Sequence, residues 1–453
     1  MFRIPGKVMS PERLEAVLQS IDSALEDDDA ELAWSRLQPL WKAQAHQEDI
    51  AKRLLDMVEQ RRLPVERGLD VLEAVAAAYP DNPEMLGLVG VSTEGARDLD
   101  RLNLAAPEAE FFAGLVARLD ELLAQAEDPE DEAKLLAGLA TAARMMARQR
   151  DEIADRAYRR LVELSPEQSS THYNYGLYLK TRGRFKEGME ANQRASALAA
   201  EPVEAYDWNL GICATGAREG KVALAVWKRL GQKIEMGRFD LPEGGYPHCK
   251  VTLAERPLAE RNERHDNPGL EETVWIERLS PCHGIVRSVL YQDLGVDYGD
   301  VVLIDGAPIT YHRYGEREVP VFPQLATLIR SAYRFFDFAG TQQDAGQLES
   351  ADDALDGDAV IYSHTENFRS LCASCFRDAN IDHDRHDAEQ HHVVTGRIAV
   401  PPGVDIPGLV VRLDAAVAGQ TGCRLFSPGL VEAAGLGSRA ESEQRRFDML
   451  RNA

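Results

Sequence analysis

The sequence predicts a multidomain protein in which an all-α helical repeat solenoid is followed by an α+β domain. Two observations lead to this class. Between residues 135 and 237, a pattern of small residues recurs every 34 to 35 positions, which is the spacing typical of repeat architectures. Near residue 240 the helical period gives way to short apolar runs separated by turn residues, as in strands.

The repeat is clearest around Gly176, which is followed 12 residues later by Gly188 and 19 residues later by Ala195. The copies on either side have small or apolar residues at the same three offsets: Ala142, Ala154 and Leu161 upstream, and Gly211, Ala223 and Leu230 downstream. Small residues at fixed positions let two helices approach closely. Each copy is therefore expected to be a helix-turn-helix unit, with Gly183 at the turn of the middle copy.

Residues 135–237 resemble the tetratricopeptide repeat, a helix-turn-helix unit of about 34 residues. The middle copy matches best, with a first helix over 172–179 and a second over 185–198. The upstream copy ends in the expected Pro166 but has Gly138 at a position where the family usually has a large aromatic residue. The downstream copy has Trp227 at the late aromatic position and lacks the closing proline. The resemblance implies a scaffold that binds a protein or peptide partner, and it names no reaction.

In this family, residues around the helix-contact glycine often face the binding groove. Carried over by position, the candidate peptide-binding residues are Tyr173, Asn174 and Leu177 in the middle copy, and Trp208, Asn209 and Ile212 in the downstream copy. Asn174 and Asn209 share one offset, where an amide can donate to and accept from a peptide backbone. The alternative is that Tyr173 and Trp208 only pack between helices. No basic cluster for a peptide carboxylate is evident.

Residues 1–134 form a helical N-terminal region by their pattern. Ser10 before Pro11 is typical of a helix start, and amphipathic runs cover 32–58, 64–79 and 109–126. These helices are either degenerate repeats that extend the 135–240 repeat domain or a separate helical cap.

Residues 241–453 are expected to form the α+β domain, of unknown role and topology. Strands are predicted at 249–253, 273–279, 285–290, 300–305, 319–322, 359–362, 392–400 and 409–413. Helices are predicted at 324–336, 363–376 and 438–451. The acidic stretch 342–358 is expected to be a surface loop.

Composition narrows the function classes. The net charge of −24 disfavours nucleic acid and anionic membrane partners, because both would be repelled at long range. No apolar run has the length of a membrane span or a signal peptide. Six cysteines without a signal indicate reduced thiols, so a cytoplasmic location is expected. Nothing in the sequence sets the oligomeric state.

One cluster of residues has the composition of a metal site. Cys372 and Cys375 are followed by His383 and His386, and two thiolates with two imidazoles can close a tetrahedral zinc site. Zinc is the one cofactor that the sequence suggests, although this spacing matches no standard zinc finger. The alternatives are an ordinary solvated loop or a catalytic thiol, for which Cys282 beside His283 is a second candidate. The prediction is accordingly an adaptor, and the alternative is an enzyme whose C-terminal domain is catalytic and whose repeats recruit the substrate.

Overall fold

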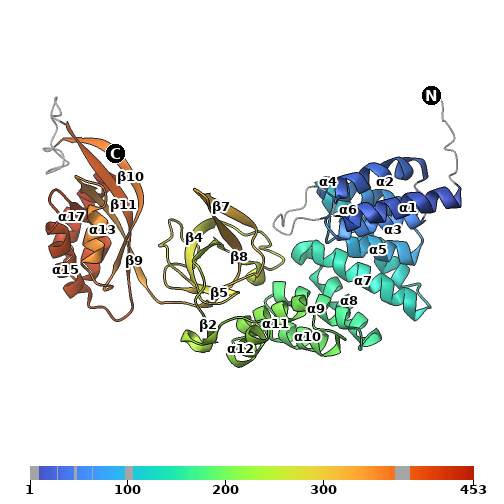
Figure 1. Ribbon diagram of the computed structural model, residues 1–453. Coiled ribbons are helices and arrows are strands. Elements are labelled where there is room, and N and C mark those ends of the chain that lie inside the picture. The colour runs from blue at the N-terminus through green and yellow to red at the C-terminus, as the bar shows by residue number, and fades with distance from the viewer. Residues whose placement is uncertain are drawn as a thin grey trace. The chain divides into compact units, whose positions relative to one another are not determined.

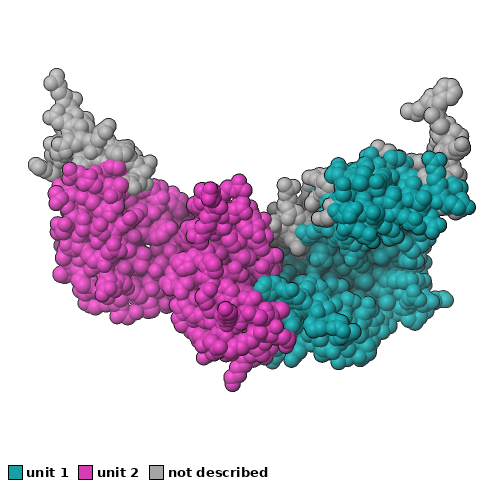
Figure 2. Space-filling model, viewed as in Figure 1, with its two compact units in different colours: residues 1–217, 259–268 teal, residues 218–258, 269–453 magenta. Residues whose placement is uncertain are grey.

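The computed structural model describes residues 10–27, 29–44, 48–63, 65–96, 106–372 and 388–452. The chain divides into two compact units, residues 1–217 with 259–268 and residues 218–258 with 269–453 (Figure 2). Helices make up the described chain as far as residue 229, and strands dominate after it (Figure 1). The predicted class, a helical repeat region followed by an α+β region, is confirmed.

The N-terminal helices of the first unit share one apolar core with the helices that follow them. They are α1 (Pro11–Glu26), α2 (Ala30–Gln44), α3 (Glu48–Glu59), α4 (Val65–Ala78), α5 (Pro83–Ser92) and α6 (Ala106–Leu123). The run predicted over 32–58 is divided between α2 and α3. Helix α5 lies in none of the predicted runs, although its start carries a recognisable signal, since the Asn82 side chain accepts a hydrogen bond from the Met85 amide at 3.1 Å.

Each of the three predicted repeat copies forms a pair of helices. The pairs are α7 (Pro129–Met145) with α8 (Asp151–Leu164), α9 (Ser169–Thr181) with α10 (Phe185–Leu198), and α11 (Glu204–Gly216) with α12 (Gly220–Arg229). A short turn of 3₁₀ helix, Ala147–Arg150, precedes α8. The turn between α9 and α10 contains Gly183 at φ +69°, a conformation that glycine adopts without steric cost. Helix α12 belongs to the second compact unit.

The small residues of the repeat lie where helices are closest. A Cβ atom built on Gly176 of α9 would lie 2.3 Å from Nδ2 of Asn192 on α10. One built on Gly188 would lie 2.9 Å from Sγ of Cys213 on α11. Ala142, Ala154, Ala195 and Ala223 are all fully buried. The recurring small residues of the sequence therefore correspond to helix contacts.

Gly138, which departs from the repeat signature, also lies at a close contact. A Cβ atom on Gly138 of α7 would lie 2.6 Å from the carbonyl oxygen of Gly87 on α5. One on Gly90 of α5 would lie 2.5 Å from Cα of Gly138. A large aromatic residue at position 138 would be incompatible with this approach of α7 to α5.

The second unit contains a closed, mainly antiparallel barrel (Figure 1). Its strands are β3 (Cys249–Ala254), β4 (Glu271–Arg278), β5 (His283–Val286), β6 (Val301–Ile304), β7 (Thr310–Tyr314) and β8 (Arg317–Ile329). They follow the order β3-β4-β5-β6-β8-β7, and a parallel pairing between β3 and β8 closes the barrel. Alternate residues of β3, Cys249, Val251 and Leu253, are buried inside. A two-stranded ribbon of β1 (Glu235–Met236) and β2 (Pro242–Glu243) precedes the barrel.

A four-stranded antiparallel sheet completes the second unit, in the order β10-β11-β9-β12. Its strands are β9 (Arg334–Gln342), β10 (Val360–Cys372), β11 (Ala388–Val400) and β12 (Arg424–Phe426). Phe338 of β9 packs in a core with α15 (Ile406–Ala418) and α16 (Pro428–Ala433), whereas the next residue, Ala339, packs against α17 (Gly437–Asn452). Successive strand residues point to opposite faces, so helices cover both faces of this sheet.

Four predictions for this region are wrong. Residues 324–336 are not a helix but the end of β8 and the start of β9, and residues 363–372 are the strand β10 rather than a helix. In both cases pairing with a distant strand overrides a local pattern that also fits a helix. Residues 409–413 belong to helix α15, which Asp405 caps through the Gly408 amide at 2.9 Å. The expected loop 342–358 contains helix α13 (Gln347–Asp353), anchored by buried Leu348 and Ala351.

Most other predictions for this region agree with the structure. The strands expected at 249–253, 273–279, 300–305, 319–322, 359–362 and 392–400 overlap β3, β4, β6, β8, β10 and β11, and the helix expected at 438–451 is α17. The strand expected at 285–290 is shorter and earlier, at β5.

Candidate protein-binding site

The six residues predicted to bind a peptide lie on α9 and α11, the first helices of two consecutive pairs. Asn174 is exposed, and Tyr173, Leu177 and Trp208 are half-buried. Asn209 and Ile212 are buried. The two asparagines therefore differ in environment although they share one repeat offset, and Asn174 is the one whose amide can meet a ligand directly. Whether these residues bind a peptide stays a prediction.

Tyr173 connects α9 with α11. Its ring lies 4.6 Å, between centroids, from the ring of Tyr206, and its hydroxyl is hydrogen-bonded to the Asn209 side chain. Tyr173 thus packs between helices, as the alternative interpretation expected, and remains half-exposed at the same time. One residue can serve both purposes, because an aromatic side chain combines an apolar ring with a polar tip.

Two buried cations lie close enough to Tyr173 to act on its pKa. Burial raises the pKa of the Tyr173 hydroxyl, and Glu94 raises it further, whereas Lys180, Asn209 and Arg144 lower it. Lys180 of α9 is 5 % exposed, and Arg144 of α7 is 9 % exposed. The sequence analysis missed both residues. The available signal was that each interrupts an apolar run, Ala142-Ala143-Arg144-Met145 in one case and Tyr178-Leu179-Lys180 in the other.

Only some of the hydrogen-bond donors of Arg144 have a partner. Its guanidinium forms an ion pair with Glu94, which follows the end of α5. Its Nε atom is buried and has no hydrogen-bond partner among the described residues. An unmet buried donor costs roughly 1 to 3 kcal/mol, more when it is charged.

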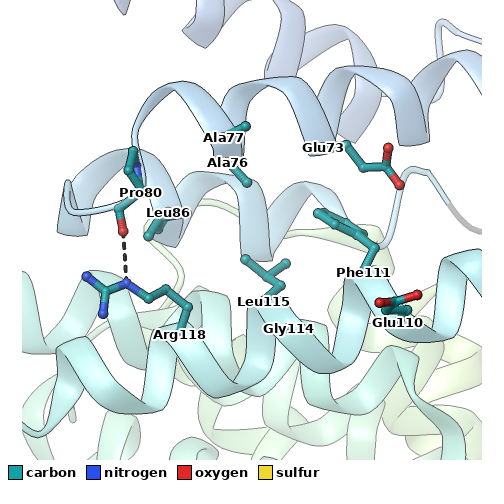
Figure 3. Close-up of a pocket in the computed structure, with 10 residues that line it drawn as sticks. All are labelled: Glu73, Ala76, Ala77, Pro80, Leu86, Glu110, Phe111, Gly114, Leu115 and Arg118. Atoms are coloured by element: carbon teal, nitrogen blue, oxygen red, sulfur yellow. Dashed lines mark hydrogen bonds between the residues drawn. The ribbon is translucent and has the colours of Figure 1, made fainter.

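A second surface feature of the first unit is an open pocket of about 520 Å³ between α4 and α6 (Figure 3). Its floor is apolar and includes Leu86 and Leu115, with Phe111 beside them, and Gly114 and Ala76 leave it wide. At one end, Nε of Arg118 donates to the carbonyl oxygen of Pro80 at 3.0 Å (Figure 3). A pocket with this lining can accept an apolar side chain. The sequence analysis did not identify it, because its small residues come from two separate helices.

The predicted zinc ligands are not tested by the structure. Cys375, His383 and His386 lie outside the described residues, and Cys372 is the last residue of β10. Among the residues that are described, no group of three or more His, Cys, Asp or Glu is placed to hold a metal ion. The zinc site stays a prediction.

The second thiol candidate, Cys282 beside His283, is completely buried. His283 Nδ1 lies 2.5 Å from Oγ of Ser280, and Sγ of Cys282 lies 3.8 Å from the same oxygen. Burial lowers the pKa of His283 to about 4, so the imidazole is neutral at pH 7. A nucleophile must meet its substrate, so this cluster fits a structural role in the loop before β5 better than catalysis.

None of the helices in the described part of the chain is long and apolar enough to cross a membrane. No protein-family model matches the chain, and no curated protein matches it. Several solved structures are similar at low identity. PilW, described as a widely conserved type IV pilus biogenesis factor, is 11% identical, with a TM-score of 0.35 over 48% of this chain and 91% of its own.

Two further solved structures are similar to this chain at comparably low identity and TM-score. PilF of Pseudomonas aeruginosa is 15% identical, with a TM-score of 0.31 over 48% of this chain and 90% of its own. MamA of Desulfovibrio magneticus RS-1 is 19% identical, with a TM-score of 0.27 over 40% of this chain and 93% of its own. These TM-scores are too low for the similarities to carry an argument about function.

Proposed function

We propose that this chain is a protein-interaction scaffold with tetratricopeptide-like helix pairs. Its helical unit would bind a peptide segment of a partner over the surface of Tyr173, Asn174, Leu177 and Trp208. One observation supports this proposal most. Half-exposed Tyr173 and Trp208 lie on the first helices of two consecutive pairs, and exposed Asn174 follows Tyr173 in the chain.

The peptide would contribute hydrogen-bond acceptors and apolar side chains. The exposed amide of Asn174 can donate to a backbone carbonyl and accept from a backbone amide. The partly exposed rings of Tyr173 and Trp208 offer apolar area at low cost in side-chain entropy.

We infer the cytoplasm as the compartment of this scaffold. Burial raises the pKa of the thiols of Cys249 and Cys423 to about 11, so both are protonated at neutral pH. The four cysteines Cys213, Cys249, Cys282 and Cys423 are buried and form no disulfide, which is usual for proteins of a reducing compartment.

The experiment that tests the surface is site-specific photo-crosslinking in cells of origin. A photoreactive residue is placed at Asn174, and in a matched variant at Gln193, an equally polar and exposed amide on the neighbouring second helix α10. We expect a defined crosslinked partner from position 174 and none from position 193. Equal crosslinking from both positions would remove this surface from consideration.

Affinity for the captured partner provides the second measurement. Asn174→Ala removes one or two backbone hydrogen bonds, each worth about 1 kcal/mol, so we expect binding to weaken by roughly three- to tenfold. Gln193→Ala should leave the dissociation constant unchanged. An Asn174→Ala variant that binds as tightly as the native chain would contradict the proposed role of this amide.

A further inference from the structure

A second pocket of the first unit, with a volume of about 620 Å³, concentrates positive charge. We call it the arginine pocket. Its lining residues come from the turn before α8, from the end of α9 and the turn after it, and from the segment 259–268: Arg148, Asp151, Tyr178, Arg182, Arg184, Arg261, Asn262, Glu263 and Arg264. Five arginines against two carboxylates give this lining a formal charge of +3, in a chain whose net charge is −24.

Two of these arginines are held in fixed positions. Arg148 is buried and donates from Nη2 to the carbonyl oxygen of Thr181 at 2.8 Å. Arg182 donates from Nε and Nη2 to one oxygen of Asp151, at 2.9 and 2.7 Å, and its guanidinium lies 4.8 Å from the ring centroid of Tyr178. The wall of the pocket is therefore ordered before any ligand arrives, which lowers the entropic cost of binding.

Carboxylates lie among the arginines of the pocket and offset part of their charge. Burial and, to a smaller extent, the charge of Arg182 lower the pKa of Arg148 to about 10, in spite of Asp151 and Asp266. Asp266, whose carboxylate accepts from the Arg148 amide at 2.8 Å, has its own pKa raised by burial. Arg148 and Arg182 are thus close enough for the charge of Arg182 to disfavour that of Arg148.

Arg264 is the arginine of this lining that a ligand can reach most directly. Its side chain is exposed, and it forms no ion pair within the part of the chain that the structure describes. Arg184 differs, because Asp155 and Glu187 hold it at 2.5 Å each. An arginine held by two carboxylates has little left to offer a ligand, whereas Arg264 keeps its planar fork of donors.

We propose that the arginine pocket binds a small molecule that carries phosphate groups. Guanidinium forks match phosphate oxygens in pairs, and a desolvated, preordered set of them favours a multiply charged anion. The pocket is larger than a single ion needs, so pyrophosphate or a phosphate ester fits it better than inorganic phosphate.

This inference is independent of the proposed peptide-binding surface, which uses other side chains. It also has a simpler competitor, in which the arginines only fasten the segment 259–268 to the helices. Gly183 supports such fastening, because a Cβ atom there would lie 2.7 Å from the carbonyl oxygen of Ala259. The two interpretations differ in whether an anion stabilises the protein.

Calorimetric titration of the full chain with pyrophosphate, inorganic phosphate and sulfate, at constant ionic strength, tests the proposal. The variant is Arg264→Glu, and the matched control is Arg13→Glu, the same charge change at an exposed arginine on α1. We expect pyrophosphate to bind the native chain and the control equally and Arg264→Glu about tenfold more weakly, because one charge-assisted contact is lost and one repulsion is gained. Pyrophosphate should also raise the melting temperature of the native chain, and raise that of Arg264→Glu by less at the same concentration.

Three outcomes would overturn the proposal. Pyrophosphate that neither binds nor raises the melting temperature leaves only the fastening role. Equal weakening by Arg264→Glu and Arg13→Glu would mean a general charge effect rather than this pocket. Sulfate that binds as tightly as pyrophosphate would show that the pocket does not select phosphate groups.

Discussion

Two of the close helix contacts in the first unit differ in what faces the glycine. Where α5 meets α7, Gly90 faces the backbone of Gly138. Where α9 meets α10, Gly176 faces the side chain of Asn192. A side chain can rotate away from an added methyl group, whereas a helix backbone cannot move without bending the helix. Glycines at helix contacts therefore differ in how well the contact tolerates an added methyl group.

The largest effect is expected from Gly90→Ala. The added Cβ would lie 2.5 Å from Cα and 2.6 Å from the carbonyl oxygen of Gly138, which real Cβ atoms do not tolerate. Overpacking should outweigh the gain of about 1 kcal/mol in helix propensity, leaving a net loss of about 2 kcal/mol in the free energy of unfolding. Urea unfolding, followed by the circular dichroism signal of the helices, measures this change in the free energy of unfolding. Stability equal to the native chain would mean that α5 and α7 are further apart.

Gly176→Ala should cost less, about 1 kcal/mol, because the obstacle is the Asn192 side chain. That side chain donates to the carbonyl oxygen of Gly188 at 2.7 Å, so moving it sacrifices one buried hydrogen bond. Asn192→Ala provides the control by removing the obstacle. In a double-mutant cycle, the combined variant should lose about 1 kcal/mol less than the sum of the single variants. Additive losses would contradict the assigned contact.

Gly114→Ala on α6 should have the smallest effect and the opposite sign. No heavy atom lies within 4 Å of the position its Cβ would take, and the residue lies in the pocket between α4 and α6 (Figure 3). Helix propensity alone then acts, and we expect a gain of about 0.5 to 1 kcal/mol in the same urea experiment. A loss of stability here would show that the pocket is filled in solution.

The sequence predicted the helical repeat well because its signals are local. Gly176, Gly188 and Ala195 lie within one helix pair, and the second helix of that pair begins and ends at the predicted residues. Strand β8 shows the opposite case, because its residues pair with β3, β6 and β7. β7 is its hairpin neighbour, but β3 and β6 are distant in sequence, and no local pattern reports those two pairings. Helix α15 was missed for a local reason, since its β-branched Val410 and Val411 favour strand.

The candidate site was predictable only in part. The repeat offset led to Tyr173 and Trp208, which are half-exposed on consecutive first helices. The same offset did not distinguish exposed Asn174 from buried Asn209, because burial depends on how successive helix pairs stack. Arg144 could not be placed either, since its ion-pair partner Glu94 follows another helix earlier in the chain. Periodicity identifies which positions recur, whereas charge pairing depends on the three-dimensional packing.

The segment 259–268 has a consequence for biosynthesis. The chain leaves the first unit after residue 217, returns at residue 259 and leaves again after residue 268. The hydrogen bond from the Arg148 amide to the Asp266 carboxylate therefore cannot form until the ribosome has added a further 118 residues. When β3 of the second unit has been synthesised, the first unit is still incomplete. A gene fragment that stops at residue 217 encodes a helical unit without its last segment, and a fragment intended to contain the whole unit has to extend through residue 268.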